Sequence, residues 1–462
     1  MFRLFKHYVP YAVVWLALFE FAVLLVSAEA AWHIYAHQTG FDAGPLIGRW
    51  VPVVTFALAN ALAMMAVGMY GTEALRAMGF ATARLLAAIS LGVIFLSVVR
   101  FLLPDATLWR ANSLYAMVLA IGALLIVRLA LTQSAGADAF RRRILVLGAG
   151  PRAARLKGLA NAPGSGLSIV GFVAMRPSET AVPEALPRAS VPSLADHAVA
   201  LGAGEVVLAM EERRGALPLS DLLRVKTTGV HVNDMAGFLE RETGRVDLAT
   251  TNPSFLIFSD GFSAGQRIAK VSKRLFDIVA SLAVLVIGLP LILLAGIAVK
   301  LDSKGPIFYR QPRVGLYGQI YNIVKIRSMR TDAEAAGQAV WASENDPRVT
   351  RVGHIIRKLR IDELPQTWCV LKGEMSFVGP RPERPSFVEE LTRALPYYAE
   401  RHMVKPGLTG WAQINYPYGA SVEDARVKLE YDLYYAKNYS PFLDLLILLQ
   451  TVRVVLWPDG AR

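Results

Sequence analysis

The sequence contains a single cysteine, Cys369, among 462 residues. One cysteine excludes an intrachain disulfide, so no oxidising compartment is implied. The chain also lacks internal repeats, low-complexity tracts and an N-terminal cleavage site of the kind that ends a signal peptide. These absences exclude a disulfide framework and a repeat protein, and the length predicts two or three domains.

Long apolar runs are abundant, and apolar residues make up 54% of the chain, which is high for a soluble protein. Four runs near the N-terminus approach the ~20 residues that cross a bilayer: Val9–Val26, Val51–Tyr70, Leu85–Leu103 and Leu114–Leu131. With the N-terminus inside, seven flanking basic residues are cytoplasmic and three lie outside, which satisfies the positive-inside rule. Residues 1–135 are therefore predicted to form four transmembrane helices.

Three polar residues stand out in this region. Glu20 lies at membrane depth, where an acid is either functional or a neutral carboxyl hydrogen-bonded between helices; we favour the second interpretation. His33 and His37 have the spacing of a metal-binding pair on a helix, but they lie among aromatic residues just beyond a span. An interfacial belt is the favoured interpretation.

Residues 141–266 are predicted to form a Rossmann-like cytoplasmic domain with a linker. The run from Ile144 to Ala153 indicates a buried strand, a glycine turn and a helix start, where a phosphate can bind. Apolar strands at Ile169–Ala174 and Val206–Met210 favour a parallel sheet. The acidic residue expected after the second strand of a dinucleotide site is missing, so the glycines are assigned to packing and no cofactor-binding residue is predicted. Residues 235–266 are predicted to be a tail or linker.

A fifth apolar run, Leu275–Val299, contains Pro290, which should bend the helix. Basic residues flank both of its ends: Arg267, Lys270, Lys273, Arg274, Lys300, Lys304, Arg310 and Arg313. A helix that enters the membrane, bends at Pro290 and returns would keep both clusters on the cytoplasmic face. An ordinary kinked span is the alternative.

The adjacent acids Asp362 and Glu363 follow a cluster of cations and precede Pro365. Proline is tolerated in a first helical turn, so a helix is predicted to begin at Pro365 and to run through Trp368 to Leu371. Adjacent residues do not share a face of a helix, so the two acids should have different roles, one attacking and one holding a metal ion. An acidic pair at this position is otherwise just a helix N-terminus.

The surroundings of the pair favour a functional interpretation. Several motifs occur in one order: Lys300–Pro306, Phe308–Gly315, Lys325–Met329, Arg357–Gln366, Gly379–Glu383 and Lys405–Gln413. Together they resemble the bacterial sugar transferase family, over about Lys270 to Arg462. The stretch Asn415–Ser421 resembles the exopolysaccharide subgroup associated with exosortase systems.

This resemblance implies that residues 267–462 form a monotopic catalytic domain with a re-entrant helix broken at Pro290. It implies transfer of a sugar 1-phosphate from a UDP-sugar to undecaprenyl phosphate, with release of UMP. Asp362 would be the covalent nucleophile, Glu363 would bind Mg²⁺, and Arg357 and Arg381 would contact phosphate. The implied location is the cytoplasmic face of a bacterial inner membrane, in contact with membrane lipids. A homodimer and downstream glycosyltransferases are further predictions. The identity of the sugar stays open.

Charge fits this interpretation better than a nucleic-acid partner. Residues 267–462 carry 27 of the 49 basic and 19 of the 37 acidic residues, in a chain of net charge +12. Such a segment suits anionic lipid and a phosphorylated substrate, whereas its long apolar run argues against nucleic acid. Since every motif lies after Lys270, a protein lacking residues 1–266 is predicted to keep some activity.

Two apolar stretches and two alternative functions complete the predictions. Val404–Tyr416 has glycines and aromatics suited to a lipid interface, and Phe442–Trp457 is either an in-plane amphipathic helix or one docked on the core. A membrane nucleotide-sugar dehydratase or epimerase would use a Tyr-x-x-x-Lys pair, which Tyr321 and Lys325 match only in spacing. A non-enzymatic scaffold that senses nucleotide would not need the acidic pair.

Overall fold

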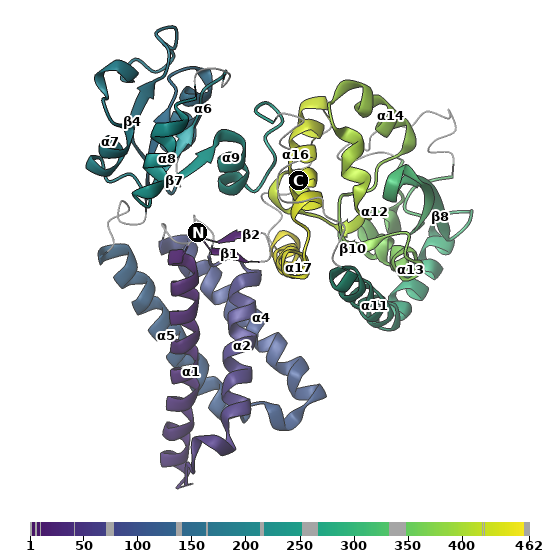
Figure 1. Cartoon of the computed structure of the whole chain (residues 1–462). Coiled ribbons are helices and arrows are strands. Elements are labelled where there is room, and N and C mark those ends of the chain that lie inside the picture. The colour runs from purple at the N-terminus through teal and green to yellow at the C-terminus, as the bar shows by residue number, and fades with distance from the viewer. Residues whose placement is uncertain are drawn as a thin grey trace. The chain divides into compact units, whose positions relative to one another are not determined.

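The computed structural model describes residues 2–4, 7–9, 11–40, 42–70, 78–134, 141–162, 165–212, 217–251, 267–331, 348–417, 419 and 421–456. Apart from a few residues near the N-terminus, the chain divides into two compact units between Thr243 and Gly244 (Figure 1). A two-stranded sheet near the N-terminus is formed by β1 (Phe2–Leu4) and β2 (His7–Val9).

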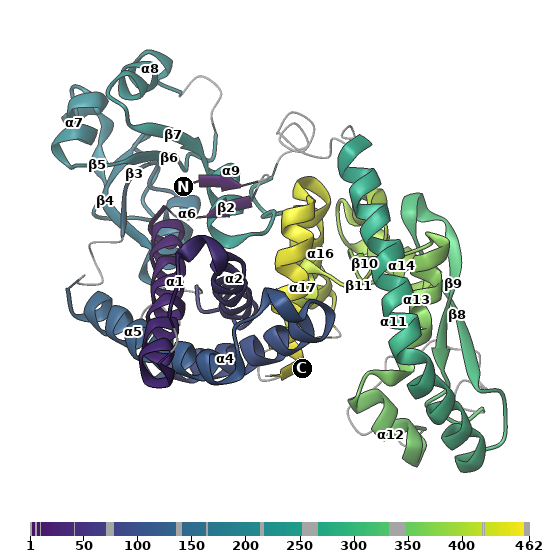
Figure 2. The ribbon, with the colours of Figure 1, turned by 90° about the horizontal axis from the view of Figure 1, so that it is seen from below.

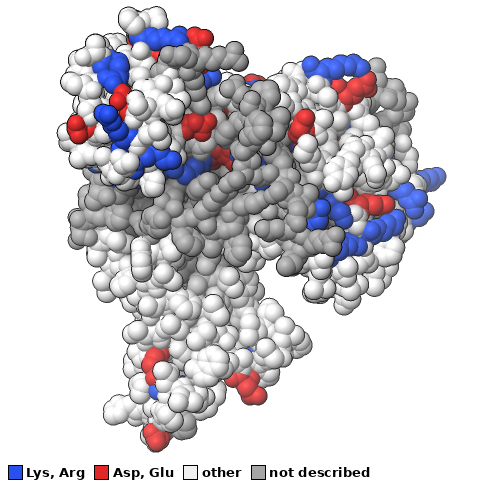
Figure 3. Space-filling model, in the orientation of Figure 1, with Lys and Arg blue, Asp and Glu red and all other residues white. Residues whose placement is uncertain are grey.

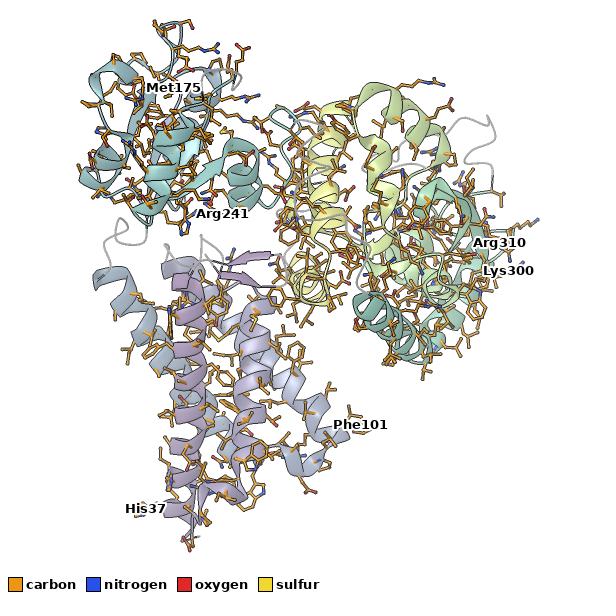
Figure 4. All side chains as sticks on the ribbon, in the orientation of Figure 1. His37, Phe101, Met175, Arg241, Lys300 and Arg310 are labelled. Carbon is orange, nitrogen blue, oxygen red and sulfur yellow. The ribbon has the colours of Figure 1, made fainter. Side chains whose placement is uncertain are left out.

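Four long helices follow, and each predicted N-terminal run falls on one of them: α1 (Tyr11–Thr39), α2 (Trp50–Ala66), α4 (Met78–Leu102) and α5 (Arg110–Ser134), with the short turns η1 (Leu46–Gly48) and η2 (Pro104–Ala106). Over the described residues, Val13–Thr39, Arg84–Leu102 and Pro104–Leu131 are long and apolar enough to cross a membrane, and α2, with 17 residues, is apolar but shorter. Figure 3 shows a largely uncharged surface along these helices, and Phe101 points away from them in Figure 4.

A buried ion pair connects the first and last of these helices. Arg128 on α5 donates from Nε to Glu20 Oε1 at 2.7 Å and from Nη2 to Oε2 at 3.0 Å. Glu20 thus bonds between helices as predicted, but its partner is a cation. His33 lies beside Glu29, at 3.2 Å, and near Arg49.

The second part of this unit contains a five-stranded parallel sheet in the order β5-β4-β3-β6-β7, which confirms the predicted parallel sheet. Helices alternate with its strands, and apolar clusters cover both faces. The elements are β3 (Arg142–Leu147), α6 (Pro151–Asn161), β4 (Leu167–Ala174), β5 (Leu186–Pro187), η3 (Arg188–Ser190), α7 (Leu194–Ala200), β6 (Glu205–Leu208), α8 (Leu219–Thr227), β7 (His231–Asp234) and α9 (Met235–Thr243). Residues 235–243, expected in a tail or linker, instead form α9, whose Met235 and Phe238 are fully buried.

The glycine turn after β3 packs against the Ala209 backbone and donates a hydrogen bond to the Glu179 side chain. Gly148 has φ +123°, and a Cβ there would lie 2.9 Å from the Ala209 backbone, so only glycine fits. The Glu179 carboxylate accepts hydrogen bonds from the backbone N–H of Ala149 at 3.0 Å and of Met175 at 2.9 Å. The close approach of Gly148 to Ala209 agrees with the packing role that the sequence predicts for these glycines.

The first described helix of the second unit is α11 (Arg267–Asp302), and short strands and helices follow it: β8 (Phe308–Val314), η4 (Leu316–Gly318), β9 (Ile320–Ile326), α12 (Arg351–Lys358), η5 (Ile361–Gln366), α13 (Thr367–Lys372), β10 (Ser376–Val378), α14 (Pro385–Ala394), η6 (Tyr398–Met403), β11 (Gly407–Thr409), α15 (Trp411–Asn415), α16 (Val422–Asn438) and α17 (Pro441–Leu456). Strands β8 and β9 form an antiparallel hairpin, and β10 pairs in parallel with β11.

Helix α11 is one uninterrupted helix with Pro290 inside it, and Lys270–Asp302 is long and apolar enough to cross a membrane. It contacts α12 and α13 (Figure 2). Its outer face is apolar, with exposed Leu282, Val286, Ile287, Leu289, Leu293, Leu294 and Ile297. The re-entrant path stays a prediction.

Two of the basic residues at the start of α11 bond to protein groups. Lys273 Nζ lies 2.6 Å from Asp444 Oδ2 and 3.0 Å from the Val378 carbonyl, and Arg274 donates to the Val370 carbonyl at 2.7 Å. At the other end, exposed Lys300 lies on the same side of the unit as Arg310 (Figure 4).

The sequence predicts a lipid interface at Val404–Tyr416, and for Trp411 this prediction is wrong. This ring is buried and stacks on Tyr434, with centroids 5.9 Å apart. Nearby glycines allow two backbones to cross closely, since a Cβ on Gly407 would lie 2.1 Å from Gly379 N. Helix α17 docks on the core through its fully buried Leu443 and Ile447, which confirms one of the two alternatives for that stretch.

Residues 244–251 lie against α16 in the second unit. The Trp411 indole N–H donates to the Gly244 carbonyl at 2.6 Å, and Val246 N–H donates to the Glu430 carbonyl at 3.0 Å. Val246 is fully buried. This segment therefore belongs to the core of the unit that carries the acidic pair.

A fragment of residues 244–462 should unfold at a higher temperature than one of residues 267–462. Burying Val246 alone contributes about 1.5–3 kcal/mol, in addition to its hydrogen bond with Glu430. Thermal unfolding in matched detergent tests this. A Val246→Ser variant of the longer fragment should move toward the shorter one, and equal unfolding temperatures for both fragments would contradict the packing role.

Candidate active site

The acidic pair lies in η5, between α12 and α13. Thr350 caps α12 by accepting a hydrogen bond from Gly353 N–H at 3.0 Å. After α12, Arg360 takes a left-handed conformation with φ 57°, which turns the chain sharply ahead of the pair. Pro365 lies inside η5 and the α-helix begins at Thr367, so the predicted start at Pro365 is two residues early.

Glu363 is surrounded by cations. Lys325 Nζ on β9 donates to Glu363 Oε1 at 2.9 Å, and Arg381 Nη2 lies 3.7 Å from the same oxygen. Arg360 Nη1 lies 3.6 Å from Oε2. Burial alone would raise the pKa of Glu363, but these cations, Lys325 first, lower it to about 2. Glu363 is therefore ionised at neutral pH.

Asp362 has a different environment. It is buried, and its Oδ1 atom has no hydrogen-bond partner among the residues that the structure describes. Burial and the neighbouring Glu363 charge raise its pKa, against the opposing charges of Lys325 and Arg357. The two acids thus have opposite pKa shifts, because their surroundings differ. A buried carboxylate oxygen without a donor is also uncommon and calls for an explanation.

The structure brings three of the four predicted site residues together. Asp362 and Glu363 are adjacent, and Arg381 reaches Glu363 from the loop between β10 and α14. Arg357, near the end of α12, acts on Asp362 through its charge. Pro290, the predicted helix break, is exposed on α11. Two residues before it, a Cβ on Gly288 would lie 3.5 Å from Leu364 Cδ1, so α11 passes directly beside the pair.

Lys325 is a site residue to which the sequence assigned no role. The sequence places Lys325 only in the motif Lys325–Met329 and in a Tyr-x-x-x-Lys spacing with Tyr321. In the structure it forms an ion pair with Glu363 across 38 residues of sequence, and its side chain is 20% exposed. The available signal was its position between Val324 and Ile326, because a lysine in an apolar strand usually has a buried partner.

The donor set suits Mg²⁺ only with help from a substrate. No group of three or more His, Cys, Asp or Glu residues is placed to hold a metal in the described part of the chain. Mg²⁺ is commonly held by one or two carboxylates together with substrate phosphates. Glu363 and the unpartnered Asp362 oxygen fit that pattern. A metal ion at Glu363 would compete with Lys325 for Oε1.

Comparisons with known proteins match the part of the chain that contains this site. A family model described as bacterial sugar transferase matches residues 268–458. The chain is 42% identical over 196 residues to EpsL of Bacillus subtilis, an uncharacterized sugar transferase, covering 42% of this chain and 91% of that protein. It is 42% identical over 191 residues to a UDP-glucose:undecaprenyl-phosphate glucose-1-phosphate transferase of Caulobacter vibrioides, covering 41% and 71%. The chain belongs to the bacterial sugar transferase family.

A third relative is matched over a smaller share of its length. The UDP-N-acetylgalactosamine-undecaprenyl-phosphate N-acetylgalactosaminephosphotransferase of Aeromonas hydrophila is 48% identical over 190 residues, covering 41% of this chain and 45% of that protein. The match thus spans less than half of that relative. These alignments cover about two fifths of this chain, as the family match does.

Proposed function

We propose that this protein transfers a sugar 1-phosphate from a UDP-sugar to undecaprenyl phosphate and releases UMP. The observation that carries the proposal is the unpartnered buried oxygen of Asp362, beside a carboxylate that cations hold ionised. The names of the relatives from Aeromonas and Caulobacter support both substrate classes. They differ in the sugar, so the sugar used by this chain stays open.

The proposed reaction has two displacements at the β-phosphorus of the UDP-sugar. In the first, an Asp362 oxygen forms a bond to phosphorus while the bond from phosphorus to the UMP oxygen breaks, and UMP leaves with that electron pair. In the second, an oxygen of undecaprenyl phosphate attacks the same phosphorus and Asp362 leaves as a carboxylate. The acceptor oxygen is already ionised, so no strong base is needed.

Nearby cations would stabilise the charge that develops on the phosphoryl oxygens. Arg381 has a planar guanidinium suited to two-point phosphate contact, and it already lies beside the pair. Arg357 would contribute charge from α12. Lys325 would hold Glu363 ionised and oriented. Fixed charges of this kind act strongly in a site that excludes water.

Mg²⁺ is the proposed metal, with Glu363 as its protein ligand. Bound there, it would neutralise charge on the diphosphate. The residues of this chain would still supply the nucleophile and the arginine contacts.

The decisive experiment is a UMP-release assay on membranes containing the full chain, with several UDP-sugars and with undecaprenyl phosphate. We expect UMP release that requires a specific UDP-sugar and is lost with EDTA. Release of no UMP with any UDP-sugar would contradict the proposal, and activity unaffected by EDTA would remove the Mg²⁺ role. Conversion of the sugar without UMP release would instead indicate the dehydratase or epimerase alternative, and no turnover at all would favour a scaffold.

Activity should fall at acid pH with an apparent pKa above that of an ordinary aspartate. Asp362 must be ionised to attack, and its burial and Glu363 raise its pKa. Because a nearby positive charge favours the ionised carboxylate, an Arg357→Gln variant should move the acid limb to higher pH. Arg393→Gln, which removes an exposed cation on α14, is the control. pH profiles normalised to each maximum test this, and superimposed limbs for wild type and Arg357→Gln would contradict it.

We also propose that α11 is re-entrant and that the site faces the cytoplasm of a bacterial inner membrane, where UDP-sugars are made. Proline at membrane depth frees a backbone carbonyl that needs a local partner. The uncharged outer face of α11 suits lipid contact. The resemblance to the exopolysaccharide subgroup further supports initiation of an exported polysaccharide.

Cysteines placed at Lys270 and Lys304 should both react with a membrane-impermeant thiol reagent only from the cytoplasmic side. Both positions are exposed, and the native Cys369 is buried, so background labelling should be low. Labelling at Lys304 from outside would contradict the re-entrant path. A Pro290→Leu variant should favour a straight span, with a fall in activity and little loss of membrane association.

A further inference from the structure

The loop that carries Arg381 contains two prolines, which cannot donate backbone hydrogen bonds. Residues 379–384, here called the arginine loop, connect β10 to α14 (Figure 1). Pro380 and Pro382 flank Arg381 and have no backbone N–H. The loop therefore has few donors of its own, and its conformation depends on what binds its carbonyl groups.

Each of four consecutive carbonyls in the arginine loop accepts a hydrogen bond from elsewhere in the unit. The donors come from β8, from η6 and from the start of β11. The pairs are Gly407 N to Pro380 O at 2.9 Å, Arg401 Nη2 to Arg381 O at 3.0 Å, Arg313 Nη1 to Pro382 O at 2.8 Å, and Val314 N to Glu383 O at 3.0 Å.

Two of these donors are arginine side chains, of which Arg401 is buried and Arg313 is half-buried. Arg401 is 5% exposed and is paired with Asp432, with Nη2 at 2.6 Å from Oδ2. Arg313 is 14% exposed and also donates to Gln311 Oε1, at 3.1 Å from Nε. Burying a guanidinium is costly unless its donors are used. Each of the two guanidinium groups uses one of its nitrogens to donate to a backbone carbonyl at or just after Arg381.

We infer that Arg313 and Arg401 are positioning residues that act through Arg381. They fix the backbone of the arginine loop so that the Arg381 guanidinium lies beside Glu363, at 3.7 Å. Charge-assisted hydrogen bonds are stronger than neutral ones, so these two contacts restrict the loop most. The inference rests on the proposed function in one respect, the contact of Arg381 with the transferred phosphate.

A double-mutant cycle on the full-length protein in membranes tests the inference. Arg313→Met should lower kcat by about 10- to 100-fold, because a displacement near 1 Å at a catalytic group costs about that much. KM for the UDP-sugar should change less. In an Arg381→Ala background, Arg313→Met should lower kcat by no more than about 3-fold further, since its effect passes through Arg381. If the decrease in kcat of the double variant equals the product of the two single decreases, the inference is wrong.

Matched variants separate positioning from general damage. Arg393→Met makes the same chemical change at an exposed arginine of α14 and should leave kcat unchanged. Arg313→Lys keeps the positive charge and can still donate a hydrogen bond, so it should restore part of the activity, and the cycle is repeated with it if Arg313→Met does not fold. Asp432→Asn weakens the ion pair with Arg401. It should lower kcat on its own and lower it little further in the Arg381→Ala background.

The inference and the proposed function fail in distinguishable ways. Full activity of Arg381→Ala would overturn the proposed role of Arg381, and the inference with it. Impaired Arg381→Ala beside fully active Arg313→Met and Asp432→Asn variants would overturn only the inference.

Discussion

An Asp362→Asn variant should fold and stay in the membrane but lose on the order of 10⁴- to 10⁶-fold in transfer rate, the scale seen when a nucleophile is removed. The amide has nearly the same shape but cannot form the covalent intermediate. Its stability should equal or exceed that of the wild type, because the replaced carboxylate is buried, lacks a partner at Oδ1 and faces ionised Glu363. UMP release and thermal unfolding measure the two effects.

The stability measurement distinguishes a nucleophile from a structural acid. A structural carboxylate would leave unsatisfied donors when replaced, and the protein would become less stable. Asp362→Ala is run in parallel because Asn can deamidate. Near-wild-type UMP release in both variants would remove Asp362 from the mechanism.

A Lys325→Met variant should lose both activity and stability. It leaves the half-buried Glu363 carboxylate without its nearest cation. Removing one partner of a fully buried ion pair costs about 3–5 kcal/mol, and a smaller loss is expected here because Arg360 and Arg381 stay near Glu363. In the wild type the pKa of Glu363 is lowered to about 2 from an ordinary value of 4.5, so the stabilisation is present above pH 4.5 and is lost as pH falls through 2. The stability gap between wild type and variant should therefore be widest near neutral pH and should shrink below pH 4.5.

The double variant Lys325→Met, Glu363→Gln provides the control for this result. Replacing both partners removes the unpaired charge, so most of the lost stability should return while activity stays low. Denaturant unfolding at several pH values provides the measurement. A Lys325→Met protein as stable as the wild type at pH 7 would show that the ion pair does not hold Glu363.

The parts of the fold that follow from local sequence patterns could be predicted. The apolar runs of the N-terminal helices and the strands of the parallel sheet come from local patterns, and so does the acidic pair. Lys325 could not be assigned in this way, because its pairing with Glu363 depends on how β9 packs against η5. Nor could the role of Trp411, since glycines and aromatics suit a lipid interface as well as a protein core, where this ring stacks on Tyr434.

The start of α11 also explains why the apolar helix is more than an anchor. Lys273 bonds to Asp444, Arg274 to the Val370 carbonyl, and Asp277 accepts from the Ser376 hydroxyl at 3.0 Å. Gly288 lies against Leu364, the neighbour of Glu363. Cutting away this helix to obtain a water-soluble enzyme would remove one wall of the catalytic unit and expose its core. For this protein, purification requires a detergent or lipid environment that keeps α11 in place.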